Sequence, residues 1–255
     1  MFSVLTIPAF DDNYIWLIKD SQSNRCVVVD PGDASPVLAI LESQQLILDS
    51  ILITHHHYDH TGGVKDILLD NPDCQVFCKT PLFDNTTLVD EGDVLHLFDD
   101  RLTLNVWQVA GHTLDHVAYV NDEMLFCGDT LFSAGCGRVF EGTHEQMYAA
   151  LLRLAELPLE TKVYCAHEYT QNNLIFALHV DPNNSELIAY VQQVAKLRQQ
   201  GLPTIPTTIK SEMVINPFLR VTDEQLINNL QGLLSKPINK GIECFEALRV
   251  YKDNF

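Results

Sequence analysis

The sequence has few basic residues, with 16 Lys and Arg against 34 Asp and Glu and a formal net charge of −18. This charge opposes the long-range attraction to phosphates on which nucleic-acid binding depends. The chain also lacks any run approaching about 18 consecutive apolar residues, the length that indicates a membrane-spanning helix. We therefore expect neither a nucleic-acid partner nor a membrane span.

Cysteine pairs with the spacing of redox or zinc-ribbon motifs are also missing. The seven cysteines are an odd number and scattered, and no two form a Cys-x-x-Cys pair. Unpaired, reduced thiols are typical of cytosolic proteins. The N-terminus has no basic segment, and Asp11 and Asp12 interrupt it before an apolar run of signal-peptide length. These features predict a cytoplasmic protein.

The first two thirds of the chain alternate short β-rich segments with turns. Helical spacing occurs at 35–44 and 145–154, where Ser35-Pro36 has the pattern of an N-cap followed by proline at the first helical position. Runs of apolar and β-branched residues predict the strands. The predicted strands are 4–7, 15–18, 26–29, 50–54, 75–78, 102–109, 116–120, 124–127 and 162–165.

From about Tyr169 onward the pattern changes to helical periodicity with few strand signals. Gly201 lies where the C-terminal cap of one of these helices belongs. At 255 residues and 46% apolar content, the chain can bury one large core plus a smaller satellite core. We therefore predict one domain over 1–168 and a helical domain over 169–255. The predicted C-terminal helices are 172–180, 185–200, 222–231 and 242–253.

A run of six residues after the predicted strand at 50–54 is dense in metal-binding side chains. Imidazole and carboxylate groups are ligands that zinc, iron(II) and manganese favour. This density and the preceding strand favour a metal site over a His-rich surface loop that binds nothing. The run is His55-His56-His57-Tyr58-Asp59-His60.

Alternation along an extended segment predicts which of these side chains face the same way. His55, His57 and Asp59 are predicted to share one side. His56 and Tyr58 occupy the intervening positions and are predicted to pack or hydrogen-bond instead. The chain must turn at His60, and Gly62-Gly63 is predicted to supply the backbone freedom for that turn.

Three further candidate ligands follow other predicted strands: His112, Asp129 and His167. A lone histidine is more often structural than a ligand. Polar residues at the ends of several strands, however, are the usual way in which a sheet scaffold builds one site from distant segments. His116 also lies at a strand edge and is predicted to be structural or to support a ligand.

Several segments extend this pattern over essentially the whole chain. They are Gly111-His112-Thr113, Gly128-Asp129-Thr130, Gly135-Cys136-Gly137-Arg138, Cys165-Ala166-His167-Glu168-Tyr169, and the stretches 9–14 and 247–255. Together with the His-x-His-x-Asp-His motif they resemble the metallo-β-lactamase superfamily. Within it the chain is most similar to type II glyoxalase, also called hydroxyacylglutathione hydrolase.

The resemblance implies an α/β fold, an αββα sandwich of two mixed sheets in which 1–168 is catalytic and the C-terminal α-helical domain at 169–255 binds the substrate. It also implies two divalent metal ions per chain, zinc first, with iron or manganese as alternatives. The implied ligands are His55, His57 and His112 for one ion, Asp59, His60 and His167 for the other, and Asp129 as the bridge.

The implied reaction is hydrolysis of the thioester of S-lactoylglutathione, and of other S-2-hydroxyacylglutathiones, by a metal-bound hydroxide. It yields a 2-hydroxy acid and glutathione and is the second step of methylglyoxal detoxification. A thiol has a pKa of about 8.5, so its thiolate leaves readily without a general acid. Asp59 would have a catalytic role as well, in orienting the hydroxide.

Glutathione-binding residues of the family correspond to Arg138, Tyr169, Arg249 and Lys252. Glutathione carries two carboxylates, and arginine binds carboxylates through paired hydrogen bonds. The alternative for Arg249 and Lys252 is a solvated basic helix end that favours the helix dipole.

The chain departs from the family pattern near these motifs. Ala110 stands where proline is usual, Asp115 where glycine is usual, and Phe140 where tyrosine is usual. Phe140 removes one hydroxyl contact to the substrate, which predicts a lower affinity. All seven implied metal ligands are present.

Three other functions are compatible with parts of the pattern. A persulfide dioxygenase of the same superfamily would use a single iron on His55, His112 and Asp129. A superfamily hydrolase acting on phosphodiesters or lactones is a second alternative, and a non-catalytic metal-binding protein is a third. Cations in the helical C-terminus, at Arg249 and Lys252, favour the glutathione thioesterase, which we expect to be a monomer.

Overall fold

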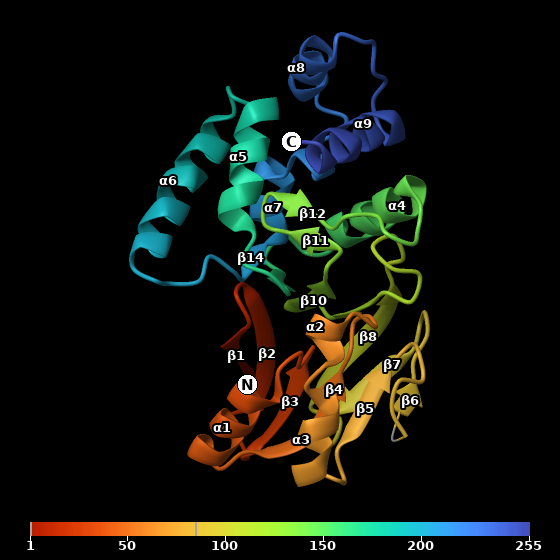
Figure 1. The fold of residues 1–255 in the computed structure, drawn as a ribbon, viewed down its shortest axis with the longest axis vertical. Helices are drawn as coiled ribbons and strands as arrows, with labels where there is room; N and C mark the ends of the chain where they lie inside the picture. Colours follow the sequence, from red (N-terminus) through yellow and green to blue (C-terminus); the bar gives the residue numbers. More distant parts are fainter. Residues whose placement is uncertain (1, 85) are drawn as a thin grey trace. The chain divides into compact units, whose positions relative to one another are not determined.

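The computed structural model describes residues 2–84 and 86–255, and the chain forms two compact units (Figure 1). Unit 1 comprises Met1–Gln108, Asp115–Asn121 and Leu125–Gly128. Unit 2 comprises Val109–Leu114, Asp122–Met124 and Asp129–Phe255. Because short segments alternate between the units, neither is one continuous stretch of sequence. The domain boundary near Tyr169 stays a prediction.

The first sheet of unit 1 is mixed, with the strand order β1-β2-β3-β4-β5-β6. Pairing is antiparallel from β1 to β3 and parallel from β3 to β6. Parallel neighbours need crossover connections, and α1 (Ala34–Gln44) and α3 (Val64–Asp70) provide two of them. The strands are β1 (Phe2–Ala9), β2 (Asn13–Asp20), β3 (Arg25–Val29), β4 (Ile47–Leu52), β5 (Gln75–Cys78) and β6 (Thr86–Leu88).

Apolar side chains of α1 and α3 pack against this sheet. Val37 and Leu41 of α1 and Val64 and Ile67 of α3 are buried in one cluster with residues of the strands, such as Val28. The apolar faces of the two short helices therefore cover one face of the sheet. The burial of this face, rather than helix propensity, accounts for the stability of helices this short.

The second sheet of unit 1 is an antiparallel meander of β7 (Val94–Leu97), β8 (Leu102–Gln108), β9 (Val117–Val120) and β10 (Met124–Gly128). Tyr119 of β9 is buried, and its hydroxyl donates to the carbonyl oxygens of Ile53 at 2.8 Å and Phe77 at 3.0 Å. One side chain of the second sheet therefore satisfies two carbonyl groups near the ends of strands in the first sheet.

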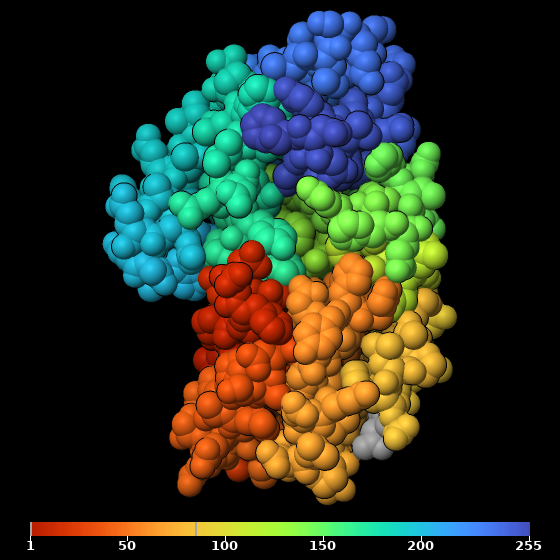
Figure 2. Space-filling model, viewed as in Figure 1, coloured from red at the N-terminus to blue at the C-terminus, as the bar shows by residue number. Residues whose placement is uncertain are grey.

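Unit 2 is mainly helical. Its cluster of buried apolar residues includes Leu174 and Ala177 of α5 and Leu187 and Val194 of α6. Figure 2 shows the side chains of α5 and α6 side by side on the surface of this unit. The elements are β11 (Leu131–Phe132), β12 (Gly135–Cys136), α4 (His144–Ala155), β13 (Lys162–Cys165), α5 (Thr170–Val180), α6 (Ser185–Gln199), β14 (Thr207–Thr208), α7 (Ile209–Ile215), the 3-10 helix η1 (Pro217–Leu219), α8 (Glu224–Leu234) and α9 (Ile242–Asp253).

The predicted helices and strands are confirmed with small shifts at their ends. Gly201 follows α6 with a φ of +70°, as its predicted capping role requires. The N-cap of α1, however, is Asp33 and not Ser35, because the Asp33 carboxylate accepts the Ser35 N–H at 2.9 Å. Pro36 consequently sits two residues further into the first turn than predicted. No helix in the described part of the chain is long and apolar enough to cross a membrane.

Candidate metal centre

The histidine-rich motif of unit 1 follows β4 and enters the short helix α2 (Tyr58–Thr61). The predicted extended geometry is therefore wrong beyond His57, because Asp59 and His60 lie on a helical turn. Gly62 and Gly63 both have negative φ, so positive-φ freedom is not the reason for glycine here. A Cβ on Gly63 would lie 2.4 Å from the Ala34 nitrogen, so glycine is needed for close backbone approach.

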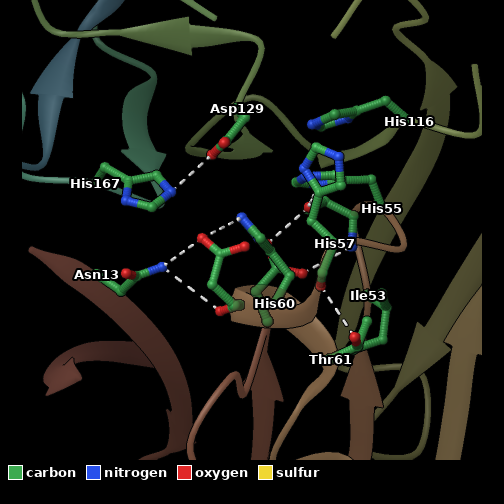
Figure 3. A network of polar contacts seen from close by, with 12 residues as sticks. Asn13, Ile53, His55, His57, His60, Thr61, His116, Asp129 and His167 are labelled. Carbon is green, nitrogen blue, oxygen red and sulfur yellow. Dashed lines mark hydrogen bonds and ion pairs between the residues drawn. The ribbon is translucent and has the colours of Figure 1, made fainter. Parts of the chain in front are cut away.

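His55 and His57 direct ring nitrogens toward one another. The distance from His55 Nε2 to His57 Nδ1 is 3.0 Å (Figure 3). His55 Nδ1 lies 3.1 Å from the hydroxyl of Thr54, which itself donates to Asp30 at 2.7 Å. The hydroxyl oxygen is then an acceptor for an Nδ1–H of His55. This arrangement leaves the Nε2 lone pair of His55 available to a metal ion.

A second carboxylate orients His60. His60 is fully buried, and its Nδ1 lies 3.0 Å from Asp30 Oδ2. Asp30 also accepts the Thr54 N–H at 2.7 Å. Donation of the Nδ1 proton to a carboxylate fixes the tautomer and makes Nε2 a better ligand. Sequence reasoning missed Asp30, although its place directly after the buried strand β3 is the same signal that identified the other candidates.

Asp59 is held by a neighbouring amide. Asn13 donates from Nδ2 to Asp59 Oδ2 at 3.0 Å, and the same oxygen lies 3.6 Å from His60 Nε2. Figure 3 shows the Asn13 side chain directed toward the His60 region. The Asp59 carboxylate is therefore fixed next to an imidazole nitrogen, as expected for two ligands of one ion.

The residues kept off the ligand list have structural contacts in unit 1. The ring of His116 stacks on that of His55, with centroids 4.6 Å apart (Figure 3). His56 Nδ1 pairs with Asp115 Oδ1 at 2.9 Å, and Thr80 donates to the other oxygen of that carboxylate at 2.9 Å. Asp115, the departure from the family pattern, thus anchors the residue between His55 and His57.

In unit 2 one carboxylate lies between two histidines. Asp129 Oδ2 is 3.4 Å from His112 Nε2, and Asp129 Oδ1 is 3.3 Å from His167 Nε2. All three side chains are buried. The dashed line between Asp129 and His167 in Figure 3 marks one of these contacts. A carboxylate that presents each oxygen to a different imidazole has the arrangement expected of a bridging ligand.

Backbone and ring contacts support this second group. His112 Nδ1 donates to the carbonyl oxygen of Arg138 at 2.8 Å, which leaves its Nε2 facing Asp129. A Cβ on Gly137 would lie 1.9 Å from the backbone oxygen of Asp129, so only glycine fits there. His167 stacks on Tyr169 with ring centroids 4.6 Å apart. The predicted ligands and Tyr169 are therefore neighbours.

The spacing within each group can be compared with metal coordination. Two ligand atoms about 2.0–2.1 Å from one tetrahedral zinc ion stand about 3.3 Å apart. The separations within the units range from 3.0 Å for His55 and His57 to 3.6 Å for Asp59 and His60. Nitrogen and carboxylate donors at these distances fit divalent metals. The His and Asp groups of the chain are compatible with a dinuclear metal site.

The predicted substrate-binding cations differ in their surroundings. The Arg138 side chain is 61% exposed and lies 3.5 Å from Asp253. Arg249 is only 2% exposed, and it donates to the Cys136 carbonyl at 2.8 Å and to Asp253 at 2.9 Å. The alternative of a solvated helix end is therefore wrong for Arg249, because its guanidinium is buried and hydrogen-bonded. Asp253 connects it to Arg138.

Lys252 is half-buried beside Arg249. Its ammonium group donates to Asn173 Oδ1 and lies 5.6 Å from the centre of the Phe218 ring. Burial, followed by the nearby charge of Arg249, lowers the pKa of Lys252 to about 7. Phe140, where the family usually has tyrosine, is exposed and packs edge-on against His112.

Comparison with known proteins gives the same superfamily for both parts of the sequence. The metallo-beta-lactamase superfamily model matches residues 9–82 and 77–167. The model of the hydroxyacylglutathione hydrolase C-terminus matches residues 168–255. A crystal structure of ETHE1 from Myxococcus xanthus superimposes with a TM-score of 0.63 at 24% identity and covers 99% of this chain and 98% of that one. These matches confirm the predicted α/β fold class, an αββα sandwich with a C-terminal helical region.

Two relatives match over their full length. The hydroxyacylglutathione hydrolase of Psychromonas ingrahamii is 63% identical over 257 residues and covers 100% of both chains. The protein of the same name from Photobacterium profundum is 50% identical, also over 100% of both chains. This chain, with its motifs and two families of His and Asp ligands in place, belongs to the hydroxyacylglutathione hydrolase family of the metallo-β-lactamase superfamily.

Proposed function

We propose that this protein hydrolyses the thioester of S-lactoylglutathione and other S-2-hydroxyacylglutathiones to a 2-hydroxy acid and glutathione. This is the second step of methylglyoxal detoxification. The observation that carries the proposal is the buried Asp129 carboxylate, which presents one oxygen to His112 Nε2 and the other to His167 Nε2. Full-length relatives that bear the name hydroxyacylglutathione hydrolase support the substrate class.

The proposed metal ligands are those predicted from the sequence. Oriented Nε2 atoms on His55 and His60 and the 3.0 Å spacing of His55 and His57 support this assignment. Zinc is the proposed ion, with iron or manganese as alternatives, because all three accept imidazole and carboxylate ligands. His55, His57 and His112 would hold one ion, Asp59, His60 and His167 the other, and Asp129 would bridge them.

Two bound divalent ions would supply a hydroxide at neutral pH by lowering the pKa of a water to about 7. Asp59, fixed by the Asn13 amide, is suited to accept a hydrogen bond from the attacking water and to orient it. A thiolate leaving group needs no proton from the protein, since a thiol has a pKa of about 8.5. The absence of a general acid from the proposed machinery is consistent with this chemistry.

Arg138, Tyr169, Arg249 and Lys252 are proposed to bind the glutathione part of the substrate, within a helical domain over 169–255 and the loop before it. The match of the hydroxyacylglutathione hydrolase C-terminus to residues 168–255 supports that boundary. Exposed Arg138 is suited to direct contact with a carboxylate. Arg249, whose donors contact Cys136 and Asp253, is suited to hold this cationic region in place.

The lowered pKa of Lys252 predicts a pH dependence of substrate binding. A pKa of about 7 means that Lys252 loses its charge as the pH rises above about 7. The KM for S-lactoylglutathione should then rise with pH, by up to about tenfold per pH unit. In Lys252→Arg the charge persists, so the ratio of wild-type to variant KM should rise with pH. A ratio that stays flat would show that the charge of Lys252 does not bind the substrate.

Arg138 provides a test of charge at an exposed position. Arg138→Glu should weaken substrate binding by more than the roughly 1 kcal/mol of an exposed pair, because repulsion replaces attraction. Arg138→Lys keeps the charge and should retain most of the kcat/KM. Metal content should not change in either variant. If the glutamate variant has the wild-type kcat/KM for S-lactoylglutathione, Arg138 is not a substrate-binding residue.

Steady-state hydrolysis of S-lactoylglutathione by purified protein of measured metal content tests the proposed function directly. Turnover with one equivalent of glutathione released per 2-hydroxy acid is expected. A persulfide dioxygenase would instead consume oxygen with glutathione persulfide and need one iron per chain. The names of the full-length relatives favour the hydrolase over this alternative.

We also propose that the protein acts in the cytoplasm as a monomer. All seven cysteines are buried free thiols, which suits a reducing compartment. The net charge of −18 continues to argue against a nucleic-acid partner.

A further inference from the structure

The segment from Asp129 to Arg138 contains a small hairpin, which we call the 131–136 hairpin. It pairs Leu131 with Cys136 and Phe132 with Gly135. Asp129 precedes it by two residues, and Arg138, whose carbonyl accepts the His112 Nδ1 proton, follows it by two. The position of this hairpin therefore affects both the proposed bridging carboxylate and the tautomer of a proposed ligand.

Strands of two residues supply few hydrogen bonds of their own, yet the hairpin is fully buried. Buried backbone groups require partners. At this hairpin the partners are side chains of helices far along the chain. Ala134 N–H donates to Glu212 Oε2 at 2.8 Å, and the Asn216 amide donates to Gly135 O at 2.9 Å and Phe132 O at 3.1 Å. The Ser133 carbonyl accepts from Asn173 at 2.9 Å.

Glu212 is the one carboxyl group in this set, and its side chain is completely buried. The same oxygen that accepts from Ala134 lies 3.0 Å from the Asn216 amide nitrogen. Burial raises the pKa of Glu212 to about 7, against the lowering effect of the Ala134 and Asn216 hydrogen bonds. The other titratable group facing it is Tyr190, which hydrogen-bonds Ser133 at 2.9 Å. A buried carboxyl group costs stability, so an apolar residue would suit this position better if packing were its only role.

We propose that Glu212, together with Asn216, is a positioning residue for the metal centre. It fixes the 131–136 hairpin and thereby holds Asp129 and the Arg138 carbonyl at the positions that metal binding requires. The inference rests on the proposed function for its effect on turnover, but its effect on metal retention can be measured separately. It also gives the helical region a role in metal binding in addition to substrate binding.

The main test compares zinc retention and kinetics in two variants of Glu212. Glu212→Ala removes the acceptor and leaves the Ala134 N–H and the Asn216 amide short of a partner. Zinc affinity, measured by chelator competition, and kcat for S-lactoylglutathione should each fall by about 10–100-fold, as for other residues that orient ligands. Glu212→Gln keeps an oxygen for both donors and places its NH₂ near the Ser133 and Thr207 hydroxyls. It should have values close to wild type.

A matched control separates positioning from general stability. Asp181 is equally buried in the helical region, where it pairs with Arg220, and it has no printed contact with the hairpin. Asp181→Ala should lower the thermal unfolding midpoint but leave zinc affinity unchanged. Should Glu212→Ala fail to fold, Glu212→Asp, which shortens the side chain by one methylene, takes its place with the same expected direction.

Stability of the metal-free protein gives an independent reading of the carboxyl group. The folded-state pKa of about 7 lies above the ordinary value of 4.5, so the folded state binds more protons between these pH values. Its contribution to stability is therefore lost as the pH rises toward 7. Glu212→Gln should lack this part of the decline.

Unchanged zinc affinity in Glu212→Ala or Glu212→Asp would overturn the inference, as would an equal loss of affinity in Asp181→Ala. These outcomes are distinct from failure of the proposed function. If the wild-type protein holds zinc but does not hydrolyse the thioester, the proposed function is wrong, and the comparison of zinc affinities still decides the role of Glu212.

Discussion

Asp129→Ala is expected to lose both metal ions together and, with them, the hydrolysis of S-lactoylglutathione. The buried Asp129 carboxylate faces His112 with one oxygen and His167 with the other. Its removal would take away the negative charge proposed to hold two cations close together. Metal ions contribute several kcal/mol of transition-state stabilisation, so kcat/KM should fall by about a thousandfold or more.

The measurement is elemental analysis of the purified variant beside its kcat/KM. Asp66→Ala is a suitable control, because Asp66 is an exposed carboxylate on α3 and is not a proposed ligand. The control should keep wild-type metal content and turnover. Full metal occupancy in Asp129→Ala, or loss of one ion with the other retained at full strength, would contradict the bridging role.

Asp30→Asn is expected to weaken metal binding by about 10–100-fold, the usual effect of altering a residue that orients a ligand. Asp30 Oδ2 takes the proton of His60 Nδ1 and that of the Thr54 hydroxyl. The asparagine amide would present a donor to one of these groups. His60 would then favour the opposite tautomer, with its proton on the nitrogen proposed to bind metal, and the orientation of His55 through Thr54 would also change.

Asp20→Asn is the matched control for this change. Asp20 is fully buried at the end of β2 in the same sheet, and it pairs with Arg101 away from the histidine motif. The control should lower stability without changing zinc affinity in a chelator competition. Equal zinc affinity in wild type and Asp30→Asn would show that Asp30 supports the fold alone.

Most of the architecture follows from local patterns in the sequence. The range 242–253 was predicted as a helix and is α9 with the same bounds, because its apolar periodicity spans three turns. The short elements could not be predicted this way. Helix α2 (Tyr58–Thr61) has too few residues for periodicity, and its turn brings Asp59 and His60 onto a helix where alternation predicts an extended chain.

Residues that act through other residues were the ones missed in the candidate site. Asp30 carries no motif of its own, and its role depends on contacts with Thr54 and His60 that are 24 and 30 residues away in sequence. Glu212 reads as an ordinary polar helix residue, but Ala134, its hydrogen-bond partner, is 78 residues away. Such roles follow from tertiary contacts and not from spacing. The ligand assignments and the substrate-binding residues stay predictions that the variants above test.

The most direct test of the account is a metal titration of the metal-free protein with zinc, followed by hydrolysis of S-lactoylglutathione at each step. Thioester hydrolysis should rise with added zinc and reach its plateau at two equivalents per chain, because both ions take part in the proposed reaction. A plateau at one equivalent, or no thioester hydrolysis at any zinc content, would contradict the proposed two-metal thioesterase.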